Sequence, residues 1–387
     1  MTYVGIDKLC FYTSNFYLDL KELAKARNQE VDKFYVGLGQ EQMSIHPPDE
    51  DVITLAANAA WLAIQDIDPN DISMILFATE SGLDFSKSCG VYIQHLLGLP
   101  KTCRILEVKQ ACYSGAGALM LAMPYLQQNP TKKVLLITSD IARYGLNTPG
   151  EPTQGCGSAA MLLSANPKLI AIEPESGYYS DHTWDFWRPN YSKDAIVDGK
   201  YSTRVYLTTL QECWKEYQKN SHREYSDHTR FCYHLPFTKM AEKAHERLRR
   251  TCGVDQITDS LISDSLEYSR RVGNSYTASL FIGLASILDH AQNDISGQRI
   301  GFFSYGSGCV AEFFSGIVQK DYKNHLTTLY HKNLLDQRKE LSITEYEEFF
   351  NHALPETGVE YATPRYTTGK FRLAGVKDHT RQYEKMF

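Results

Sequence analysis

One cysteine stands in a setting that suits nucleophilic chemistry. Cys112 lies in residues 110–118 (QACYSGAGA), which follow a short apolar run and open a long stretch without charged side chains. At the N-terminus of a helix, backbone N–H groups and the helix dipole favour the thiolate form, and such a turn directs an N–H toward a carbonyl oxygen. We therefore expect Cys112 to be a reactive thiolate. The alternative is that it is an ordinary buried thiol, one of nine in the chain.

A carboxylate follows the most apolar run of the first half of the chain. Glu80 comes directly after residues 72–79 (ISMILFAT) and precedes Ser81 and Gly82. The carboxyl ends of buried strands are where α/β active sites form, and burial raises the pKa of a carboxyl group toward the range of a general base. This position predicts a base at Glu80. The alternative is a loop glutamate that caps the next helix.

Three further polar positions have several interpretations when each is taken alone. His234 stands in CYHLPFTK, directly before a helix that we expect to begin near Pro236, and it fits a catalytic group, a core histidine or a metal ligand with Cys232. A second Cys/His pair is missing, so no metal site is predicted. Asn274 is by default a helix cap, and the segment 304–308 (SYGSG) is by default a hairpin turn.

The elements that must position these residues alternate between apolar strands and helical patterns. We expect strands at 3–12, 72–79, 103–108 and 133–139, and helices at 18–28 and 51–66, where Asp51 is a plausible cap. This alternation indicates an α/β domain with a largely parallel, covered sheet.

The second half of the chain is less regular. Residues 177–233 predict irregular insertions and short helices, followed by helices at 236–252 and 274–291. Two β runs then surround the Gly-rich turn within 299–316. A capping box, Ser342-x-x-Glu345, opens a helix ahead of a charged C-terminal tail.

Composition bounds the class of protein. The 387 residues include 40 Lys and Arg against 46 Asp and Glu, a net charge of −6, which argues against a nucleic-acid partner. The charge-free stretch ends at Lys132 and contains Tyr113, Pro124 and several Gln residues, so it indicates a buried helix and no membrane span. Nine cysteines in a chain without an N-terminal signal core indicate reduced thiols in a cytoplasmic protein.

A set of motifs extends along nearly the whole chain: GLGQ (37–40), FATESG, QACYSGAGAL, SDIARY (139–144), PTQGCGSAAMLL, DFWRP (185–189), VDGKYS (197–202), HLPFTKM, GNSYTASL and FSYGSG. Together they resemble the 3-hydroxy-3-methylglutaryl-CoA (HMG-CoA) synthases of the shorter bacterial type, within the thiolase-like condensing enzymes. The cysteine motif alone is shared with ketoacyl synthases and thiolases, whereas DFWRP, HLPFTKM and FSYGSG at these separations are much more specific.

The resemblance implies a fold and an assembly. The fold would be α/β, a thiolase-like five-layered α-β-α-β-α core from two similar halves. Residues 1–165 would form the half with Glu80 and Cys112. Residues 166–387 would form the half with His234, Asn274 and Ser307, including the insertions around 177–233. A homodimer is expected.

The resemblance also implies a reaction. Acetyl-CoA and acetoacetyl-CoA would condense with water to give HMG-CoA and CoA, a step of the mevalonate pathway toward isoprenoid precursors. The CoA thioesters are substrates, and no cofactor is expected. Cys112 would hold the acetyl group, Glu80 would remove a proton from its methyl group, and His234 would polarise the ketone.

Further positions match the family's ligand contacts. Those that would meet or support the substrate are Tyr144, Asn147, Thr153, Asp185, Ser202, Asn274 and Ser307. Those that would meet the phosphates of CoA are Lys33, Lys239 and Lys243.

Three other functions remain open at this stage. An HMG-synthase-like enzyme of polyketide β-branching would use the same three catalytic residues on substrates tethered to an acyl carrier protein. A ketoacyl synthase would use Cys112, His234 and Asn274 but would leave Glu80 without a role. A thiol-redox or zinc protein would need a C-x-x-C pair, which the sequence lacks.

Overall fold

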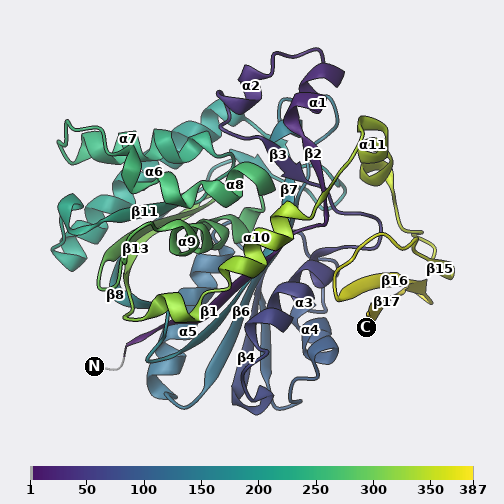
Figure 1. Ribbon diagram of the computed structural model, residues 1–387, viewed down its shortest axis with the longest axis horizontal. Coiled ribbons are helices and arrows are strands. Elements are labelled where there is room, and N and C mark those ends of the chain that lie inside the picture. Colours follow the sequence, from purple (N-terminus) through teal and green to yellow (C-terminus); the bar gives the residue numbers. More distant parts are fainter. Residues whose placement is uncertain (1–2, 387) are drawn as a thin grey trace.

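A nine-stranded sheet runs through the protein, with strand order β11-β12-β13-β8-β1-β7-β6-β4-β5 (Figure 1). The computed structural model describes residues 3–386. The two parts of the sheet join only where β1 pairs briefly with β8, at Gly5 with Ala171 and Ile6 with Ile170. A side chain at Gly5 would have its Cβ 2.1 Å from the Ile170 carbonyl oxygen, so the junction requires glycine.

The first part of the sheet has five strands. They are β1 (Val4–Tyr12), β4 (Ile72–Ala78), β5 (Arg104–Val108), β6 (Lys133–Ala142) and β7 (Gly155–Ala165). β4 lies between β5 and β6 and is parallel to both, whereas β7 is antiparallel to β6 and β1. The parallel strands therefore carry their carboxyl ends to one edge of the sheet.

The second part repeats this neighbour order with four strands. They are β8 (Ile170–Ser180), β11 (Arg230–Tyr233), β12 (Arg299–Gly306) and β13 (Val310–Val318). β11 is parallel to β12, and β13 is antiparallel to β12 and β8. The order β11-β12-β13-β8 matches β4-β6-β7-β1, as two similar halves require, while the boundary at residue 165 stays a prediction.

Helices form three layers around the two parts of the sheet. α3 (Val52–Ala63) and α4 (Cys89–Leu97) cover the outer face of the first part, and α6 (Gly199–Ser221) and α7 (Lys239–Thr251) cover that of the second. α5 (Ser114–Gln128) and α9 (Ser279–His290) lie between the two parts of the sheet. The two helices are in close contact at Gly115, where a Cβ would lie 2.7 Å from the ring of Phe281. The arrangement is the expected α-β-α-β-α stack.

Local sequence explains the best-predicted helix. The Asp51 carboxylate accepts hydrogen bonds from the N–H groups of Ile53 and Thr54, and the Thr54 hydroxyl accepts from the Asp51 N–H. This capping box starts α3 where the sequence predicted. Ten of its twelve residues are buried against β7, β1 and β6, so the alanine-rich run serves close packing on a sheet.

One prediction about the middle of the chain is wrong. Residues 177–233 contain the 23-residue helix α6 instead of only short helices. Its buried stripe includes Tyr206, Leu210, Cys213 and Tyr217, at helical spacing, and packs on β8 and β13. The other residues of α6 are mostly polar, and aromatic side chains make up much of the buried stripe. The helical period was therefore not apparent from the pattern of hydrophobic residues in the sequence.

Other elements begin or end differently from the predictions. α7 begins at Lys239, and α9 begins at Ser279 after a 3₁₀ turn, Tyr276–Ala278. β5 is an edge strand and is partly exposed, because the outer side of the sheet ends there.

The charged C-terminal tail forms regular structure. It forms a three-stranded sheet from β15 (Tyr361–Ala362), β16 (Phe371–Lys377) and β17 (Thr380–Lys385). Arg372 of β16 is nearly buried and pairs with the buried Asp49 at 3.1 Å, so long-range contacts fix this segment.

Smaller elements complete the structure. A three-stranded sheet consists of β2 (Phe16–Asp19), β3 (Gln42–Ser44) and β14 (Lys339–Glu340), and a two-stranded ribbon consists of β9 (Phe186–Trp187) and β10 (Ile196–Val197). The other helices are α1 (Leu20–Ala26), α2 (Asp32–Tyr35), α8 (Glu267–Val272), α10 (Thr328–Asp336) and α11 (Ile343–Asn351). Within residues 3–386, no helix is long and apolar enough to cross a bilayer.

Candidate active site

The carboxyl ends of neighbouring parallel strands bring two predicted residues into contact. Glu80 follows β4, and Cys112 lies in the turn between β5 and α5. The Cys112 thiol donates a hydrogen bond to Oε1 of Glu80, with 2.9 Å between sulfur and oxygen. This contact joins a nucleophile and a base that lie 32 positions apart in the chain.

The protonation state predicted for Cys112 is wrong. Burial raises the pKa of the Cys112 thiol well above its usual value, and the charge of Glu80 and the hydrogen bond to it raise it further. The position near the N-terminus of α5 favours thiolate, but desolvation beside a carboxylate outweighs that effect. Cys112 is therefore a thiol in the free protein, with an acceptor in place for its proton.

The pKa of Glu80 is raised, as its position after a buried strand predicts. Burial raises its pKa to about 8, and the charge of Asp140 adds to that shift. The hydrogen bond from Cys112 and the positive charge of Arg188 act in the opposite direction. The carboxyl group thus exchanges its proton near neutral pH, which suits proton transfer to and from a substrate.

Sequence reasoning missed the residue that holds the Glu80 loop. Asp140 is fully buried, and its Oδ1 accepts hydrogen bonds from the Thr79 hydroxyl at 2.8 Å and from the N–H groups of Glu80 and Ser81 at 2.9 Å. Its Oδ2 accepts from the Thr277 hydroxyl and N–H. Asp140 thereby ties β6 to the base and to the start of α9. In SDIARY, Asp140 stands directly after the apolar run 133–139, but nothing in that motif indicates that its carboxylate reaches Glu80.

His234 is at the end of β11 and not directly before a helix. Its N–H donates to the Phe303 carbonyl oxygen at 2.8 Å, and its Nδ1 lies 2.7 Å from the Ser279 hydroxyl. Burial lowers the pKa of His234 to about 3, so the imidazole is neutral. Among the described residues it makes no hydrogen bond with Cys112 or Glu80.

The turn between β12 and β13 meets the cysteine loop. It is the predicted hairpin turn, and a Cβ at Gly306 would lie 2.4 Å from the carbonyl oxygen of Gln110, so the two backbones are in close contact. The Gln110 side chain donates to the Ser307 carbonyl oxygen at 3.2 Å. Ser307 is therefore held beside the turn that carries Cys112.

Asp185 and Ser202 are hydrogen-bonded to each other next to this turn. Asp185 is fully buried, and its Oδ2 accepts from the hydroxyls of Ser202 at 3.0 Å and Tyr305 at 2.5 Å. Its Oδ1 accepts from the N–H of Gly308 at 3.0 Å. Through these hydrogen bonds Asp185 supports the turn between β12 and β13. Ser202 is connected to this turn by its hydrogen bond to Asp185.

Tyr144 lies near Cys112, and Asn274 is buried in the turn that precedes α9. Burial raises the pKa of Tyr144, and so do the nearby charges of Cys112 and Glu80. Asn274 is buried and accepts a hydrogen bond from the Tyr276 N–H at 2.8 Å, which shapes the turn before α9. Asn274 thus closes a turn and does not cap α9, which begins five residues later.

Two predicted residues lie in the loop between β6 and β7. Asn147 is exposed and has a left-handed backbone with φ of 59°. The Thr153 hydroxyl donates to the Gly150 carbonyl oxygen at 2.8 Å. Neither side chain forms a hydrogen bond with Cys112 or Glu80 in the part of the chain that the structure describes.

The three predicted CoA-binding lysines come from two adjoining segments. Lys33 lies in α2, and Lys239 and Lys243 lie in the first turns of α7. The Lys239 N–H donates to the carbonyl oxygen of Leu38 at 2.8 Å, which joins the two segments. Lys33 and Lys243 are exposed, so this surface presents positive charge toward solvent.

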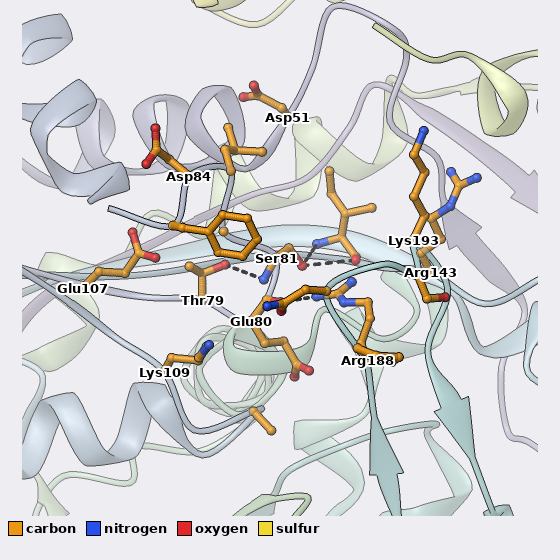
Figure 2. A pocket seen from close by; sticks show the side chains of 18 of the residues that line it. Asp51, Thr79, Glu80, Ser81, Asp84, Glu107, Lys109, Arg143, Arg188 and Lys193 are labelled. Carbon is orange, nitrogen blue, oxygen red and sulfur yellow. Dashed lines mark hydrogen bonds between the residues drawn. The ribbon is translucent and has the colours of Figure 1, made fainter. Parts of the chain in front are cut away.

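Glu80 lies in the wall of a cavity of about 1290 Å³. Glu80, Ser81 and Ser307 line it, and Figure 2 shows Arg188 beside Glu80 with Arg143 and Lys193 farther along the wall. The three lysines of α2 and α7 are not among its lining residues. Across residues 3–386, no group of three or more His, Cys, Asp or Glu side chains is placed to hold a metal ion.

Models of one known protein family match the N-terminal and the C-terminal parts of the chain. A family model described as the N-terminal part of hydroxymethylglutaryl-coenzyme A synthase matches residues 2–168. Its C-terminal counterpart matches residues 170–253 and 250–365.

Individual proteins agree with the family match. A hydroxymethylglutaryl-CoA synthase from Enterococcus faecalis is 39% identical over 384 residues, which covers 98% of this chain and 99% of the relative. A polyketide biosynthesis 3-hydroxy-3-methylglutaryl-ACP synthase from Bacillus subtilis is 33% identical and covers 100% and 96%. A crystal structure of an HMG-CoA synthase complexed with CoA superimposes with a TM-score of 0.93 at 39% identity and covers 99% and 100%. The chain has the thiolase-like fold of these enzymes and belongs to the hydroxymethylglutaryl-CoA synthase family.

Proposed function

We propose that Cys112, Glu80 and His234 condense acetyl-CoA with acetoacetyl-CoA and water to give HMG-CoA and free CoA. This condensation is the reaction of the family. The observation that carries the assignment of residues is the hydrogen bond of 2.9 Å from the Cys112 thiol to the Glu80 carboxylate. It places a nucleophile and a base within reach of one acetyl group.

Acetyl transfer is the first step. As the Cys112 sulfur attacks the carbonyl carbon of acetyl-CoA, its proton passes to Glu80, which already accepts it in a hydrogen bond. The thioester bond of acetyl-CoA breaks, and CoA leaves as a thiol after it takes up that proton. The raised pKa of Cys112 gives no obstacle, because deprotonation accompanies attack.

Condensation uses the same carboxylate a second time. Glu80 removes a proton from the acetyl methyl group, and the enolate carbon attacks the ketone carbon of acetoacetyl-CoA. Glu80 then returns the proton to the new alkoxide, and water hydrolyses the thioester to Cys112, which releases HMG-CoA.

His234 supplies a neutral donor to the ketone. Its imidazole is uncharged at physiological pH because burial lowers its pKa to about 3. The Ser279 hydroxyl lies 2.7 Å from Nδ1, and we assign the ring proton to Nε2, from which it would be donated to the ketone oxygen. We assign Tyr144, Asn147, Thr153, Asp185, Ser202, Asn274 and Ser307 to substrate contact or support, as the resemblance implies.

The lysine surface supports CoA as the carrier of the substrates. Lys33, Lys239 and Lys243 offer cations to phosphate groups on one surface. A carrier-protein substrate is the second candidate, since one relative at 33% identity is a 3-hydroxy-3-methylglutaryl-ACP synthase. The test compares acetyl-CoA with an acetylated acyl carrier protein as donor to acetoacetyl-CoA, with HMG-CoA measured by mass spectrometry. Transfer from the carrier protein alone would contradict this proposal.

The pH dependence of condensation follows from the pKa of Glu80. Since burial raises this pKa to about 8, the carboxyl group is mostly protonated below that pH and then accepts no proton from the acetyl methyl group. Acetylation of Cys112 removes a hydrogen bond that lowers this pKa, so we expect the rate of condensation by acetylated enzyme to rise with pH through a midpoint at or above 8. A rate that is flat between pH 6 and pH 9 would contradict the role of Glu80.

We also propose that two copies of the chain associate through β5. Within residues 3–386, no strand pairs with the outer edge of β5, and Leu106 on that strand is 53% exposed. An apolar side chain on an open strand edge favours pairing with a second copy. Phe85, which is 90% exposed and lines the same cavity as Leu106, adds apolar surface.

Substitution of Leu106 tests this dimer. Leu106→Lys is expected to weaken association about tenfold or more, because the substitution would bury a charge in the interface. Sedimentation velocity over a dilution series would show the change. Leu329→Lys, at a leucine that is 72% exposed on α10, is the control and should leave association intact. Unaltered protein that sediments as a monomer would contradict the dimer.

A cytoplasmic location is proposed on chemical grounds. All nine cysteines are free thiols in the described structure, and eight of them take no part in the proposed reaction. Free thiols in this number suit a reducing compartment. Fractionation of cells with activity measured in each fraction would test the location.

A further inference from the structure

Arg188 lies beside Glu80 (Figure 2) and has no role in the proposed reaction steps. Arg188 follows β9, and its Nη2 donates a hydrogen bond to the main-chain oxygen of Glu80. The side chain is half-buried, lines the cavity and lies beside Glu80 in Figure 2. The Glu80 N–H donates to Asp140, so the two polar groups of the Glu80 backbone are held from two different segments of the chain.

The segment that carries Arg188 is anchored on both sides. Asp185, three residues earlier, is bonded to the Tyr305 hydroxyl and to the Gly308 N–H. The ring of Phe186 lies 6.2 Å from that of Tyr144 and 5.8 Å from that of Tyr276. β9 also pairs with β10. The guanidinium is therefore held in place by packing and hydrogen bonds around it.

The charges that face Glu80 have opposite signs. Asp140 from β6 disfavours negative charge on Glu80, while Arg188 favours it and the hydrogen bond from the Cys112 thiol favours it too. The hydroxyl groups of Tyr144 and Tyr276 face the same space and respond to the charge of Glu80. Arg188 is the one cation among the groups that act on Glu80 in the described structure.

We propose that Arg188 is a positioning residue for the base: it fixes the Glu80 backbone from the cavity side and supplies positive charge that favours the ionised form of this carboxyl group, against the effect of Asp140. The proposal rests on the proposed function, because it assumes that Glu80 is the base. It also gives a physical reason for arginine within the DFWRP motif. A guanidinium can hold a carbonyl oxygen and remain charged at every working pH, which a neutral side chain cannot do.

Two substitutions separate the charge from the hydrogen bond. Arg188→Met removes both, and the pH midpoint of condensation by acetylated enzyme is expected to move up by about one unit, with about a tenfold loss of rate at pH 7 that is recovered at high pH. Arg188→Lys keeps the charge, so its midpoint should stay near that of the unaltered protein. The KM for acetyl-CoA should change little in both variants.

The control is Arg250→Met. Arg250 is exposed near the end of α7, and its partner is Glu246 within the same helix, so its removal should leave the midpoint unchanged. If Arg188→Met fails to fold, Arg188→Gln removes the same charge, keeps an N–H donor, and is expected to shift the midpoint in the same direction.

The outcomes distinguish this proposal from the one on which it rests. An Arg188→Met protein that acetylates Cys112 and condenses with an unshifted midpoint would overturn the role of Arg188 and leave the proposed function intact. An equal shift in Arg188→Lys would show that charge is not what Arg188 supplies, and would also overturn it. Failure of the unaltered protein to acetylate Cys112 would instead overturn the proposed function.

Discussion

Cys112→Ser protein is expected to form no acetyl-enzyme and to lose condensation activity by roughly 10⁴-fold or more. The serine hydroxyl fits the space and can still donate to Glu80, but it is a far weaker nucleophile toward a thioester at neutral pH. Brief exposure to radiolabelled acetyl-CoA, followed by precipitation of the protein, measures the acetyl-enzyme. A steady-state assay of HMG-CoA formation measures the overall reaction.

A second cysteine provides the matched control. Cys252 is half-buried at the C-terminal end of α7, and it does not contact Glu80. Cys252→Ser should acetylate and condense like the unaltered protein. If Cys112→Ser protein retained a full stoichiometric acetyl group, a different residue would be the nucleophile.

Glu80→Gln protein is expected to acetylate Cys112 and yet to condense about 10³-fold more slowly. The amide is nearly isosteric but cannot take a proton from the acetyl methyl group. Acetylation persists because loss of the Glu80 charge removes one cause of the raised Cys112 pKa, which offsets the loss of a proton acceptor. Single-turnover measurements with pre-acetylated enzyme and acetoacetyl-CoA isolate the affected step.

The acetyl-enzyme serves as an internal control in that experiment. Its formation shows that Glu80→Gln protein is folded and binds acetyl-CoA. Condensation at the rate of the unaltered protein would show that Glu80 is not the base. Loss of acetylation together with condensation would instead place the main role of Glu80 in the first step.

Sequence patterns predicted the frame of the site well where one physical cause dominates. The apolar runs of β4 and β6 are covered on both faces, so each is continuous and conspicuous. Because parallel strands end at one edge of the sheet, residues that follow them could be expected to meet, and Glu80 and Cys112 do. The capping box at Asp51 likewise depends only on local chemistry.

Features that depend on distant partners could not be predicted in this way. The thiol state of Cys112 follows from burial and from Glu80, which outweigh the local effect of α5. Asp140 acts on the Glu80 loop and Arg188 reaches Glu80 across the cavity, and no spacing in the sequence reveals either contact. The C-terminal sheet is similar, since its order depends on pairs such as Arg372 with Asp49.

The central claim is that Cys112 carries the acetyl group next to Glu80. The most direct test is peptide mapping by mass spectrometry after the unaltered protein is exposed briefly to acetyl-CoA and quenched in acid. We expect a single acetyl group on the peptide that contains Cys112, which disappears when acetoacetyl-CoA is added before the quench. An acetyl group on another residue, or none on Cys112 while HMG-CoA is still formed, would contradict the account.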